Sequence, residues 1–205
     1  MKSPLGLLPL GIALAIALGG CYLPVRFDAE IEIDRRGYYS MIFDGYMVKV
    51  PLYADLRQNK LSLPQEKERV ELIKADLVRD SSTKEFQYFK QGHFKLHWEK
   101  QGDLLKAKFV SFIRRNENML SVMYVDDSRA VTIQGAAIAD NISKQLRDIG
   151  LDMQGDIRVI TDAKVVSHNA ANEQPFPKKG PKFKMYTWKL RSIDDPTPKM
   201  LIVLQ

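Results

Sequence analysis

The three histidines are the side chains that most directly suggest acid–base chemistry or metal binding. His93 and His97 stand four residues apart in a stretch with strand character, so both side chains should point to the same face. A metal site would need a third ligand, but none stands at a recognisable spacing, and His168 is distant in the sequence. We therefore predict surface or packing histidines, with no metal and no cofactor.

Other groupings that could support catalysis are also incomplete. His168 and Asn169 suggest acid–base chemistry, but no serine sits in a glycine-flanked turn that would present it as a nucleophile. The acidic residues of Asp28–Asp34 could bind calcium, yet they lack the closely spaced ligands and glycine turn of a calcium loop. Their alternation with apolar residues predicts a strand with a solvated acidic face. We expect no enzymatic activity.

The only cysteine, Cys21, has the most informative surroundings in the chain. Residues 1–20 have the three parts of an export signal: a positive start at Lys2, an apolar run over Leu5–Leu18, and two glycines at the cut. The apolar run is short for a membrane span, which needs about 20 residues. An ordinary secretory signal does not need a cysteine directly after its cleavage site, so Cys21 calls for a separate explanation.

The tetrad Leu18-Gly19-Gly20-Cys21 resembles the lipobox of bacterial lipoproteins. In that class the cysteine takes a diacylglyceryl group before a peptidase cuts in front of it. The resemblance therefore implies a signal peptide over 1–20 and a mature protein that starts at lipidated Cys21. Two acyl chains, such as palmitate, hold a protein on a membrane stably, whereas one gives only reversible binding. The alternatives are an uncleaved N-terminal anchor and a plain secretory signal followed by a chance cysteine.

The remaining 185 or so of the 205 residues suit one domain. We predict that residues 21–26 are the lipidated cysteine and a short tether, and that residues 27–205 form a single extracytoplasmic domain. The formal net charge of +6 is mild and spread along the chain. Such a charge favours an anionic membrane surface over a neutral one, and it is too weak to indicate nucleic acid as a partner.

Alternating apolar and polar residues predict strands over much of the chain. The alternation is strict over Phe27–Asp34, and after a turn at 35–37 a second strand is expected over Tyr39–Val50, in which Gly45 could form a bulge. Turn residues separate further short runs, which predicts antiparallel hairpins and meanders. These runs are Glu85–Lys90, His93–Lys100, Leu104–Arg114, Met119–Val125, Ala130–Gly135, Asp156–Thr161, Ala163–Ser167, Lys184–Leu190 and Met200–Leu204.

Two segments have the residue spacing of amphipathic helices. In Gln65–Val78 the apolar residues recur at helical spacing, and Ser62 before it completes a predicted capping box. Asp140–Ile149 also has one apolar side and is followed by Gly150, a residue type that commonly ends helices. A shorter helix is expected over 51–60. The order of elements predicts an α+β fold, an antiparallel sheet with two main amphipathic helices packed on one face.

The C-terminal part resembles that of bacterial lipoproteins with an LppM-type domain. The run Ile157–Asn169, followed by Tyr186-Thr187-Trp188, is similar to a strand ending near an asparagine and a later Thr-hydrophobic-Trp strand in that family. The lipobox and the alternating strand after it also fit this family. The resemblance implies a lipid-anchored α+β domain with no enzymatic activity, for which binding of membrane glycolipids has been suggested.

The proline-, glycine- and lysine-rich loop over 169–182 leads into the strand Lys184–Leu190 and holds the best binding candidates. Its lysines and the first lysine of the strand alternate with two phenylalanines, so they could meet acidic headgroups while the rings enter the interface. The alternative is a solvated connection with one phenylalanine packed inward. We expect the loop to lie at the surface where the domain is tethered, and the candidate contacts with anionic lipid are Lys178, Lys179, Lys182 and Lys184.

Together these patterns predict a non-catalytic envelope lipoprotein that binds lipid, glycolipid or an envelope protein partner. The alternative is an envelope enzyme whose site assembles from scattered histidines and carboxylates. In a host with two membranes we expect the outer membrane, on the side that faces the periplasm. The reason is that Tyr22 is not the aspartate that retains sorted lipoproteins at the inner membrane.

Overall fold

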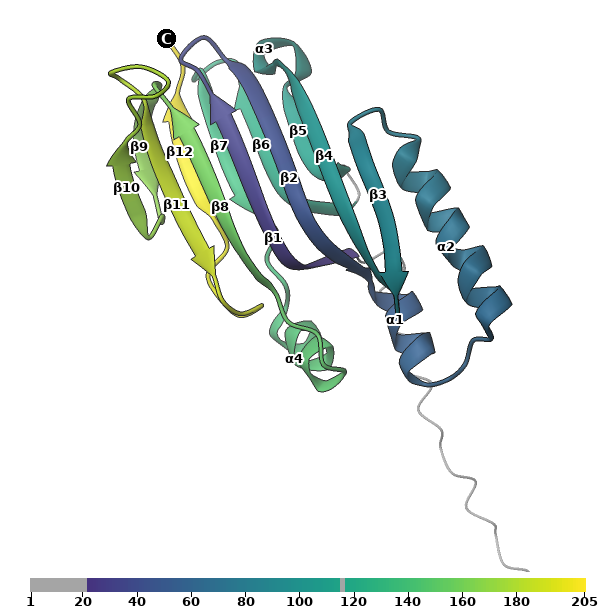
Figure 1. Ribbon diagram of the computed structural model, residues 1–205. Helices are drawn as coiled ribbons and strands as arrows, with labels where there is room; N and C mark the ends of the chain where they lie inside the picture. Colours follow the sequence, from purple (N-terminus) through teal and green to yellow (C-terminus); the bar gives the residue numbers. More distant parts are fainter. Residues whose placement is uncertain (1–21, 115–116) are drawn as a thin grey trace, which may run out of the picture.

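The computed structural model describes residues 22–114 and 117–205, which form two β-sheets that face each other (Figure 1). Sheet A has the spatial order β10 (Asn172–Pro175), β11 (Lys184–Leu190), β8 (Gln154–Thr161), β1 (Tyr22–Ile33), β2 (Tyr38–Lys49), β4 (His93–Asp103) and β3 (Thr83–Lys90). Sheet B has the order β5 (Phe109–Arg114), β6 (Glu117–Val125), β7 (Ala130–Gly135), β12 (Lys199–Val203) and β9 (Lys164–His168). The helices of this part of the chain are α1 (Val50–Arg57), α2 (Leu63–Val78), α3 (Leu104–Ala107) and α4 (Asp140–Asp148).

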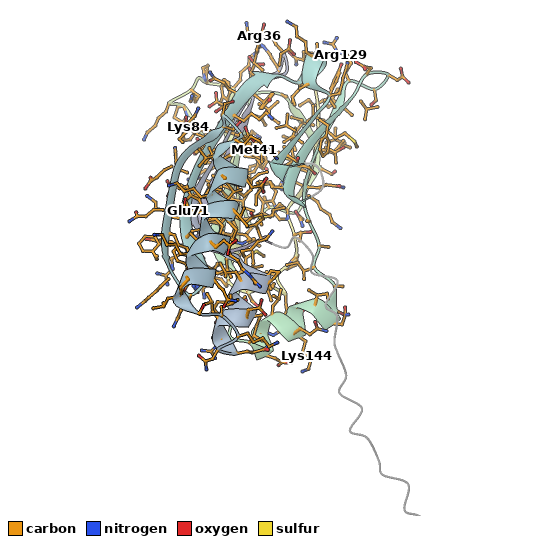
Figure 2. All side chains as sticks on the ribbon, turned by 90° about the vertical axis from the view of Figure 1, so that its right-hand side faces the viewer. Arg36, Met41, Glu71, Lys84, Arg129 and Lys144 are labelled. Atoms are coloured by element: carbon orange, nitrogen blue, oxygen red, sulfur yellow. The ribbon has the colours of Figure 1, made fainter. Side chains whose placement is uncertain are left out.

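The two ends of this sandwich have different elements, and we name them from Figure 1. The lower end is where β1 begins, and it includes Tyr22, α1 and α4. The upper end is where β1 finishes, and it includes the β1–β2 turn and α3. The side view places Lys144 of α4 at the lower end and Arg36 and Arg129 at the upper end (Figure 2).

The predicted α+β class is confirmed, with large antiparallel sheets and helices packed on them. One pairing departs from the antiparallel pattern, because β1 lies parallel to β8 along its other edge, with Arg26 opposite Gln154 and Ile33 opposite Thr161. The sequence pattern did not predict that the strands divide between two sheets. Alternation within a strand shows which side chains share a face, but it does not determine which strand lies next to it.

The chain leaves sheet A for sheet B within 104–114, which the pattern predicted as a single strand. The structure shows the short helix α3 followed by β5 instead. The Asp103 side chain accepts a hydrogen bond from the Leu105 N–H at 2.8 Å, which starts the helical turn. Lys108 then has a φ of 58°, in the left-handed region, and this ends the turn and redirects the chain.

The two main helices lie at an edge and at an end of the sandwich. The helix α2 runs beside β3, the edge strand of sheet A, and buries Val70 and Leu77 (Figures 1 and 2). Its N-terminus has the predicted capping box at Ser62. The helix α4 lies at the lower end and buries Ser143 and Leu146. In the described ranges, none of the helices has the length and apolar composition needed to cross a membrane.

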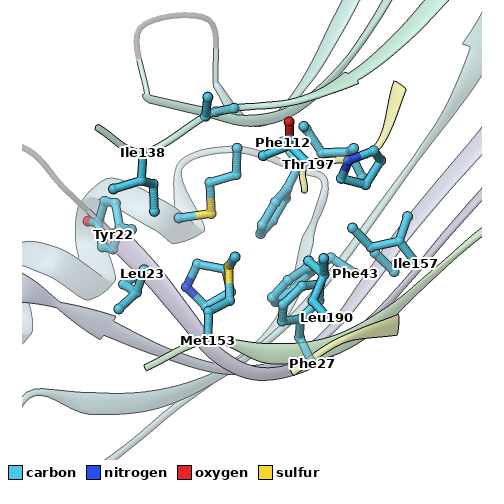
Figure 3. Close-up of a pocket in the computed structure, with 18 of the residues that line it drawn as sticks. Tyr22, Leu23, Phe27, Phe43, Phe112, Ile138, Met153, Ile157, Leu190 and Thr197 are labelled. Atoms are coloured by element: carbon cyan, nitrogen blue, oxygen red, sulfur yellow. The ribbon is translucent and has the colours of Figure 1, made fainter. Parts of the chain in front are cut away.

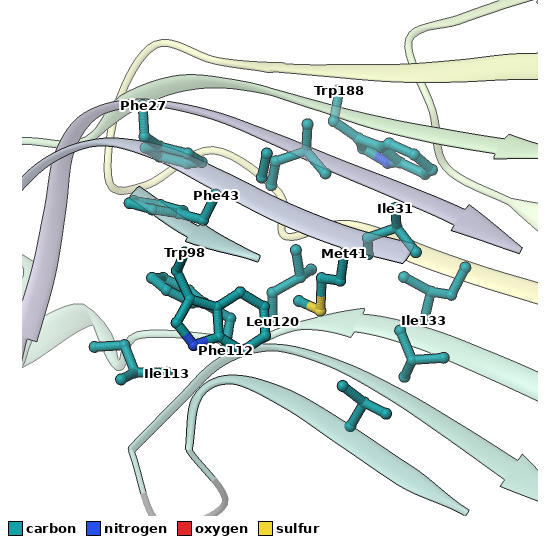
Figure 4. Packing of buried hydrophobic residues seen from close by; sticks show 14 of the residues in the cluster. Phe27, Ile31, Met41, Phe43, Trp98, Phe112, Ile113, Leu120, Ile133 and Trp188 are labelled. Atoms are coloured by element: carbon teal, nitrogen blue, oxygen red, sulfur yellow. The ribbon is translucent and has the colours of Figure 1, made fainter. Parts of the chain in front are cut away.

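Aromatic rings from both sheets stack at the centre of the sandwich (Figure 4). The ring of Phe43 on β2 stacks on that of Phe112 on β5, with centroids 4.1 Å apart and planes at 17°. Phe27 stacks on the other side of Phe43 at 5.4 Å, and Trp98 meets Phe112 edge-on at 5.3 Å. Such contacts add about 0.5–1.5 kcal/mol per pair beyond the burial of apolar area. They join the two sheets into one core.

Two glycines make room for the Phe27 side chain. A Cβ at Gly45 would lie 2.5 Å from the Phe27 Cβ, and one at Gly155 would lie 2.6 Å from its ring. The bulge suggested for Gly45 is therefore wrong, because this residue stays in register and allows close approach instead. The irregularity of this hairpin lies between Pro24 and Arg26 on β1.

The predicted tether over 22–26 is also wrong. β1 begins at Tyr22, which pairs with Lys49 of β2, and the Lys49 Nζ lies 3.8 Å from the centre of the Tyr22 ring. Tyr22 and Leu23 are only 7% and 3% exposed. These apolar residues extend the strand because they are buried between the sheets, which a solvated tether would not allow. Cys21 and the predicted signal over 1–20 lie outside the described residues.

Candidate functional site

A cavity of about 250 Å³ lies between the two sheets at the lower end (Figure 3). Its walls are apolar: Tyr22, Leu23 and Phe27 come from β1, while Met153 and Leu190 come from later segments. Among the described residues, Tyr22 and Thr197 provide its only polar side-chain groups, and no charged side chain of this part of the chain lines it. Walls of this kind favour apolar ligands over polar ones.

Elements from distant parts of the sequence build this cavity. The stacked rings of Phe27, Phe43 and Phe112 separate it from the packed core towards the upper end. At the lower end, α4 contributes Ile142 and Leu146, which are four residues apart and therefore share one side of the helix. No local motif marks these residues, which is why sequence reasoning missed the cavity.

The helix α4 is held in place beneath the cavity. Gly150, with a φ of +86°, ends the helix as predicted, and its N–H donates to the Arg147 carbonyl at 2.8 Å. The Tyr53 hydroxyl of α1 donates to the Ile149 carbonyl at 3.1 Å, and Arg147 forms an ion pair with Asp194. The cavity meets solvent beside this helix, where its lining residues Ala136 and Ala137 are exposed.

The size of the cavity limits what it can hold. A cavity of about 150 Å³ takes a benzene molecule, whereas pockets for drug-sized ligands measure about 300–1,000 Å³. The observed 250 Å³ lies between these sizes. With no described charge in its walls, the cavity suits a slim apolar group such as part of an acyl chain. A charged headgroup would remain outside.

Asn169 and Trp188, the residues that carried the C-terminal resemblance, form a clamp beside the cavity. The Asn169 Oδ1 accepts hydrogen bonds from the Trp188 Nε1 at 2.7 Å and from the Lys199 N–H at 2.8 Å. Its Nδ2 donates to the Thr197 carbonyl at 2.9 Å. The amide thus fixes the segment that holds Thr197 and Pro198, both of which line the cavity. Its role in the fold is to position this wall.

His97 lies on the outer face of sheet A between two carboxylates. Its Nδ1 is 2.8 Å from an Asp44 oxygen, and its Nε2 is 2.8 Å from a Glu99 oxygen. The hydrogen bond to Glu99 and that to Asp44 raise the pKa of His97, and partial burial opposes this rise. Because the two carboxylates bind opposite nitrogens of the ring, they lie on opposite sides of it. The three groups therefore do not converge on a common ligand.

The other two histidines lie apart from His97 and from each other. His93 is the first residue of β4, and its ring meets that of Tyr53 edge-on at 5.5 Å. His168 ends β9 in sheet B, where its Nε2 is 3.4 Å from a Glu173 oxygen. Within the described ranges, no group of three or more histidines, cysteines or carboxylates is placed to hold a metal ion.

The acidic row Asp28–Asp34 lies on the outer face of sheet A and is paired with cations. Its first two carboxylates lie 2.9 and 3.3 Å from nitrogens of Arg158. The third lies 2.8 Å from the Lys179 Nζ, and the fourth 2.9 Å from a nitrogen of Arg36. Ion pairs with a neighbouring strand, with the loop over 169–182 and with the β1–β2 turn therefore account for the whole row.

The lysine-rich loop lies at the upper end, so our expectation that it would be close to the tethered end is wrong. Lys179 binds Glu32, ten residues along β1 from Tyr22, or about 33 Å at the usual strand rise. Lys184 lies 2.8 Å from Glu173 of β10. The sequence pattern predicted the residues of β10 as part of the loop over 169–182 and not as a strand. The position of the loop follows from strand pairing, which the sequence did not reveal. Contact with anionic lipid stays a prediction.

The side chains of Lys178 and Lys182 have no ionic partner among the described residues. Lys182 and Lys184 line a second cavity of about 380 Å³, which is polar and also includes His168, Glu173 and Tyr186. The two phenylalanines of the loop are half-buried, and the N–H of Phe176 donates to the carbonyl of Phe183 at 2.8 Å. This hydrogen bond closes the loop into a turn at the upper end of the sandwich.

Comparisons with known proteins give matches among solved structures alone. No protein-family model matches the chain, and no curated protein matches it. Among solved structures, the folded domain of LppM from Mycobacterium tuberculosis is similar over 91% of this chain and 92% of that chain, with 12% identity and a TM-score of 0.47. The C-terminal sequence resembles the same type of domain, and neither likeness assigns a function to this chain.

Proposed function

We propose that this protein is a non-catalytic, lipid-anchored protein of the cell envelope whose domain holds one acyl chain, or an apolar group of similar width, between its two sheets. The observation that carries the proposal is the apolar cavity of about 250 Å³ at the lower end. Burying one methylene group contributes about 0.8 kcal/mol, so enclosing even part of an acyl chain would give measurable affinity.

The position of the cavity relative to Cys21 supports the same proposal. Tyr22 and Leu23 line the cavity, and they directly follow the cysteine that the lipobox resemblance marks for lipidation. An anchor at Cys21 would hold the open side of the cavity close to the membrane surface. The bound lipid would then exchange with the bilayer beside it. In a host with two membranes we propose the outer membrane, on its periplasmic side.

Filling the cavity tests this proposal. In the chain from Tyr22 onward, Ala29→Leu adds three carbon atoms to a cavity-lining residue of β1 that is 3% exposed. We expect wild type to bind the fluorescent fatty acid cis-parinaric acid at one site and the variant to bind it about 15- to 60-fold more weakly, because two or three of its methylenes are displaced. Emission during titration measures both affinities.

The matched control is Ala75→Leu, which adds the same atoms to an exposed position of α2 outside the cavity. This variant should bind as wild type does, and both variants should unfold cooperatively in urea. Equal binding by wild type and Ala29→Leu would refute the proposal.

The upper end of the sandwich supports a second candidate function, the binding of an anionic partner. The loop with Lys178 and Lys182, together with the polar cavity beside it, would suit an anionic partner that approaches from the side away from the anchoring membrane. An acidic surface of an envelope protein has this chemistry.

A further inference from the structure

At the lower end, the corner between α1 and α2 carries an exposed leucine in a stretch with three exposed cations. Leu63, the first residue of α2, is 81% exposed. Arg57 ends α1, Lys60 lies in the connection and Lys67 follows Leu63 by four residues on α2, and none of these exposed side chains has an ionic partner among the described residues. We call the stretch from Arg57 to Lys67 the α1–α2 corner. Isolated exposed leucines are common on protein surfaces, so a role for Leu63 has to follow from its position in the fold.

The path of the chain places this corner on the anchored side. β1 begins at Tyr22, directly after Cys21, and consecutive Cα atoms are about 3.8 Å apart. An anchor on Cys21 therefore leaves almost no slack between the membrane and the lower end. The helix α1 follows Lys49, the strand partner of Tyr22, and carries the corner about 12 Å further. Figure 1 shows the corner and α4 projecting below the strands.

The α1–α2 corner and α4 differ in whether their cationic side chains form ion pairs. On α4, Lys144 is paired with Asp148 at 2.8 Å, and Arg147 is paired with Asp194. At the corner the three cations have no ionic partner among the described residues, although Lys67 stands between the carboxylates of Glu66 and Glu68 in the sequence of α2. Free cations beside an apolar side chain are what the headgroup region of an anionic bilayer binds, with the apolar group entering the interface.

The corner is fixed to the rest of the domain, so Leu63 is held in its exposed position. An Arg69 nitrogen lies 2.6 Å from an Asp55 oxygen and so joins α2 to α1. The Tyr88 hydroxyl donates to Glu66 of α2 and accepts from the Gly92 N–H at 3.0 Å, which joins α2 to the lower end of sheet A. Burial and the hydrogen bond to Glu66 raise the pKa of Tyr88 to about 12, so this donor is kept at neutral pH.

We propose that the α1–α2 corner is a second membrane contact, in which Leu63 enters the interface of an anionic bilayer while Arg57, Lys60 and Lys67 bind its phosphates. The proposal rests on the lipid anchor at Cys21, and it does not depend on an occupied cavity. It sets the orientation of the domain: the lower end faces the bilayer and the lysine-rich loop points away from it.

The single cysteine of the sequence makes this orientation measurable in the mature lipoprotein. Once Cys21 carries lipid, an introduced cysteine is the only free thiol and can carry an environment-sensitive dye. We would label Leu63→Cys, Leu72→Cys and Lys178→Cys in vesicles of phosphatidylcholine and phosphatidylglycerol with nitroxide quenchers in the acyl chains. Leu72 is the matched control, because it is 65% exposed on the same helix but away from the corner.

We expect the emission of the dye at position 63 to be quenched at least about twofold, because interfacial groups lie about 5–10 Å deep in the bilayer. The emission of the dyes at positions 72 and 178 should change little. Replacing Arg57, Lys60 and Lys67 by glutamine should weaken quenching at position 63 at low salt. Equal quenching at positions 63 and 72, or the strongest quenching at position 178, would overturn the proposal.

Flotation of the same samples separates failure of the anchor from failure of the corner. The lipidated protein should float with the vesicles, and the chain from Tyr22 onward, which lacks both Cys21 and the apolar leader, should not. Protein with an intact Cys21 that fails to float would overturn the anchor and the corner together. Floating protein with an unquenched dye at position 63 would overturn the corner alone. Neither result would change the binding of cis-parinaric acid in the cavity.

Discussion

The lower and upper ends of the sandwich use similar residue types in different ways. At the upper end, Lys179 and Lys184 bind carboxylates of the protein itself, and the nearby cavity has polar walls. At the lower end the cavity is apolar and the cations of the α1–α2 corner have no ionic partner in the described chain. A run of lysines is therefore a poor guide to a binding surface, because its charges are available only where the fold leaves them unpaired.

The largest effect should come from comparing two buried leucines of sheet A, one in packed core and one beside the cavity. Leu96 is fully buried in packed core, whereas Leu190 is 4% exposed and lines the cavity. We expect Leu96→Ala to lower the free energy of unfolding by about 3–5 kcal/mol and Leu190→Ala by about 2–3 kcal/mol, because atoms beside a void have fewer contacts to lose. Urea denaturation measures both values.

Adding cis-parinaric acid sharpens this comparison. A ligand in the cavity should stabilise wild type and the Leu96→Ala variant by similar amounts, and it should stabilise Leu190→Ala by a different amount. A smaller loss for Leu96→Ala than for Leu190→Ala without ligand would contradict the description of the lower end as incompletely packed.

The next largest effect on stability should come from Asn169, whose side chain holds the part of the cavity wall that contains Thr197 and Pro198. Asn169→Ala leaves the N–H of Trp188, which is 3% exposed, without its acceptor. We expect a loss of about 1–3 kcal/mol in the free energy of unfolding. Asn169→Asp is the matched control, because it keeps an oxygen for Trp188 and loses only the donor to Thr197. Equal stability of the alanine variant and wild type would show that the clamp does not hold this wall.

The smallest effect should be the contribution of His97 to the pH dependence of stability. Its partners, Asp44 and Glu99, are carboxylates of the protein itself. Because folding raises its pKa, its contribution is fully present below the unfolded pKa of about 6.5 and is lost as pH rises through the raised folded value. The carboxylates are part-exposed, so we expect about 0.2–1 kcal/mol. His97→Asn should therefore be less stable than wild type near pH 6, and the difference should shrink towards pH 9. A difference that grows with pH would contradict this assignment.

The sequence predicted local structure well. The strand Lys184–Leu190, the capping box at Ser62 and the end of a helix at Gly150 all agree with the structure, because each depends on neighbouring residues. The α+β fold class follows from the order of the helices and strands. The start of β1 was missed because Tyr22 and Leu23 look like a linker until the surface that buries them is known.

The candidate site could not be predicted in the same way. Its walls come from β1, β2, β5, α4 and the last connection of the chain, and only strand pairing brings them together. The parallel pairing of β1 with β8 and the crossing at Lys108 are long-range features with no local signal. The sequence singled out Asn169 and Trp188 by resemblance, but the hydrogen bonds that explain them appear only in the fold.

Native mass spectrometry tests the central claim most directly, that the lower cavity holds one acyl chain. The delipidated chain from Tyr22 onward would be mixed with a defined fatty acid and measured beside Ala29→Leu and Ala75→Leu. We predict one adduct per protein molecule for wild type and Ala75→Leu, and little or none for Ala29→Leu. No adduct in wild type, or the same set of adducts in all three proteins, would contradict the account.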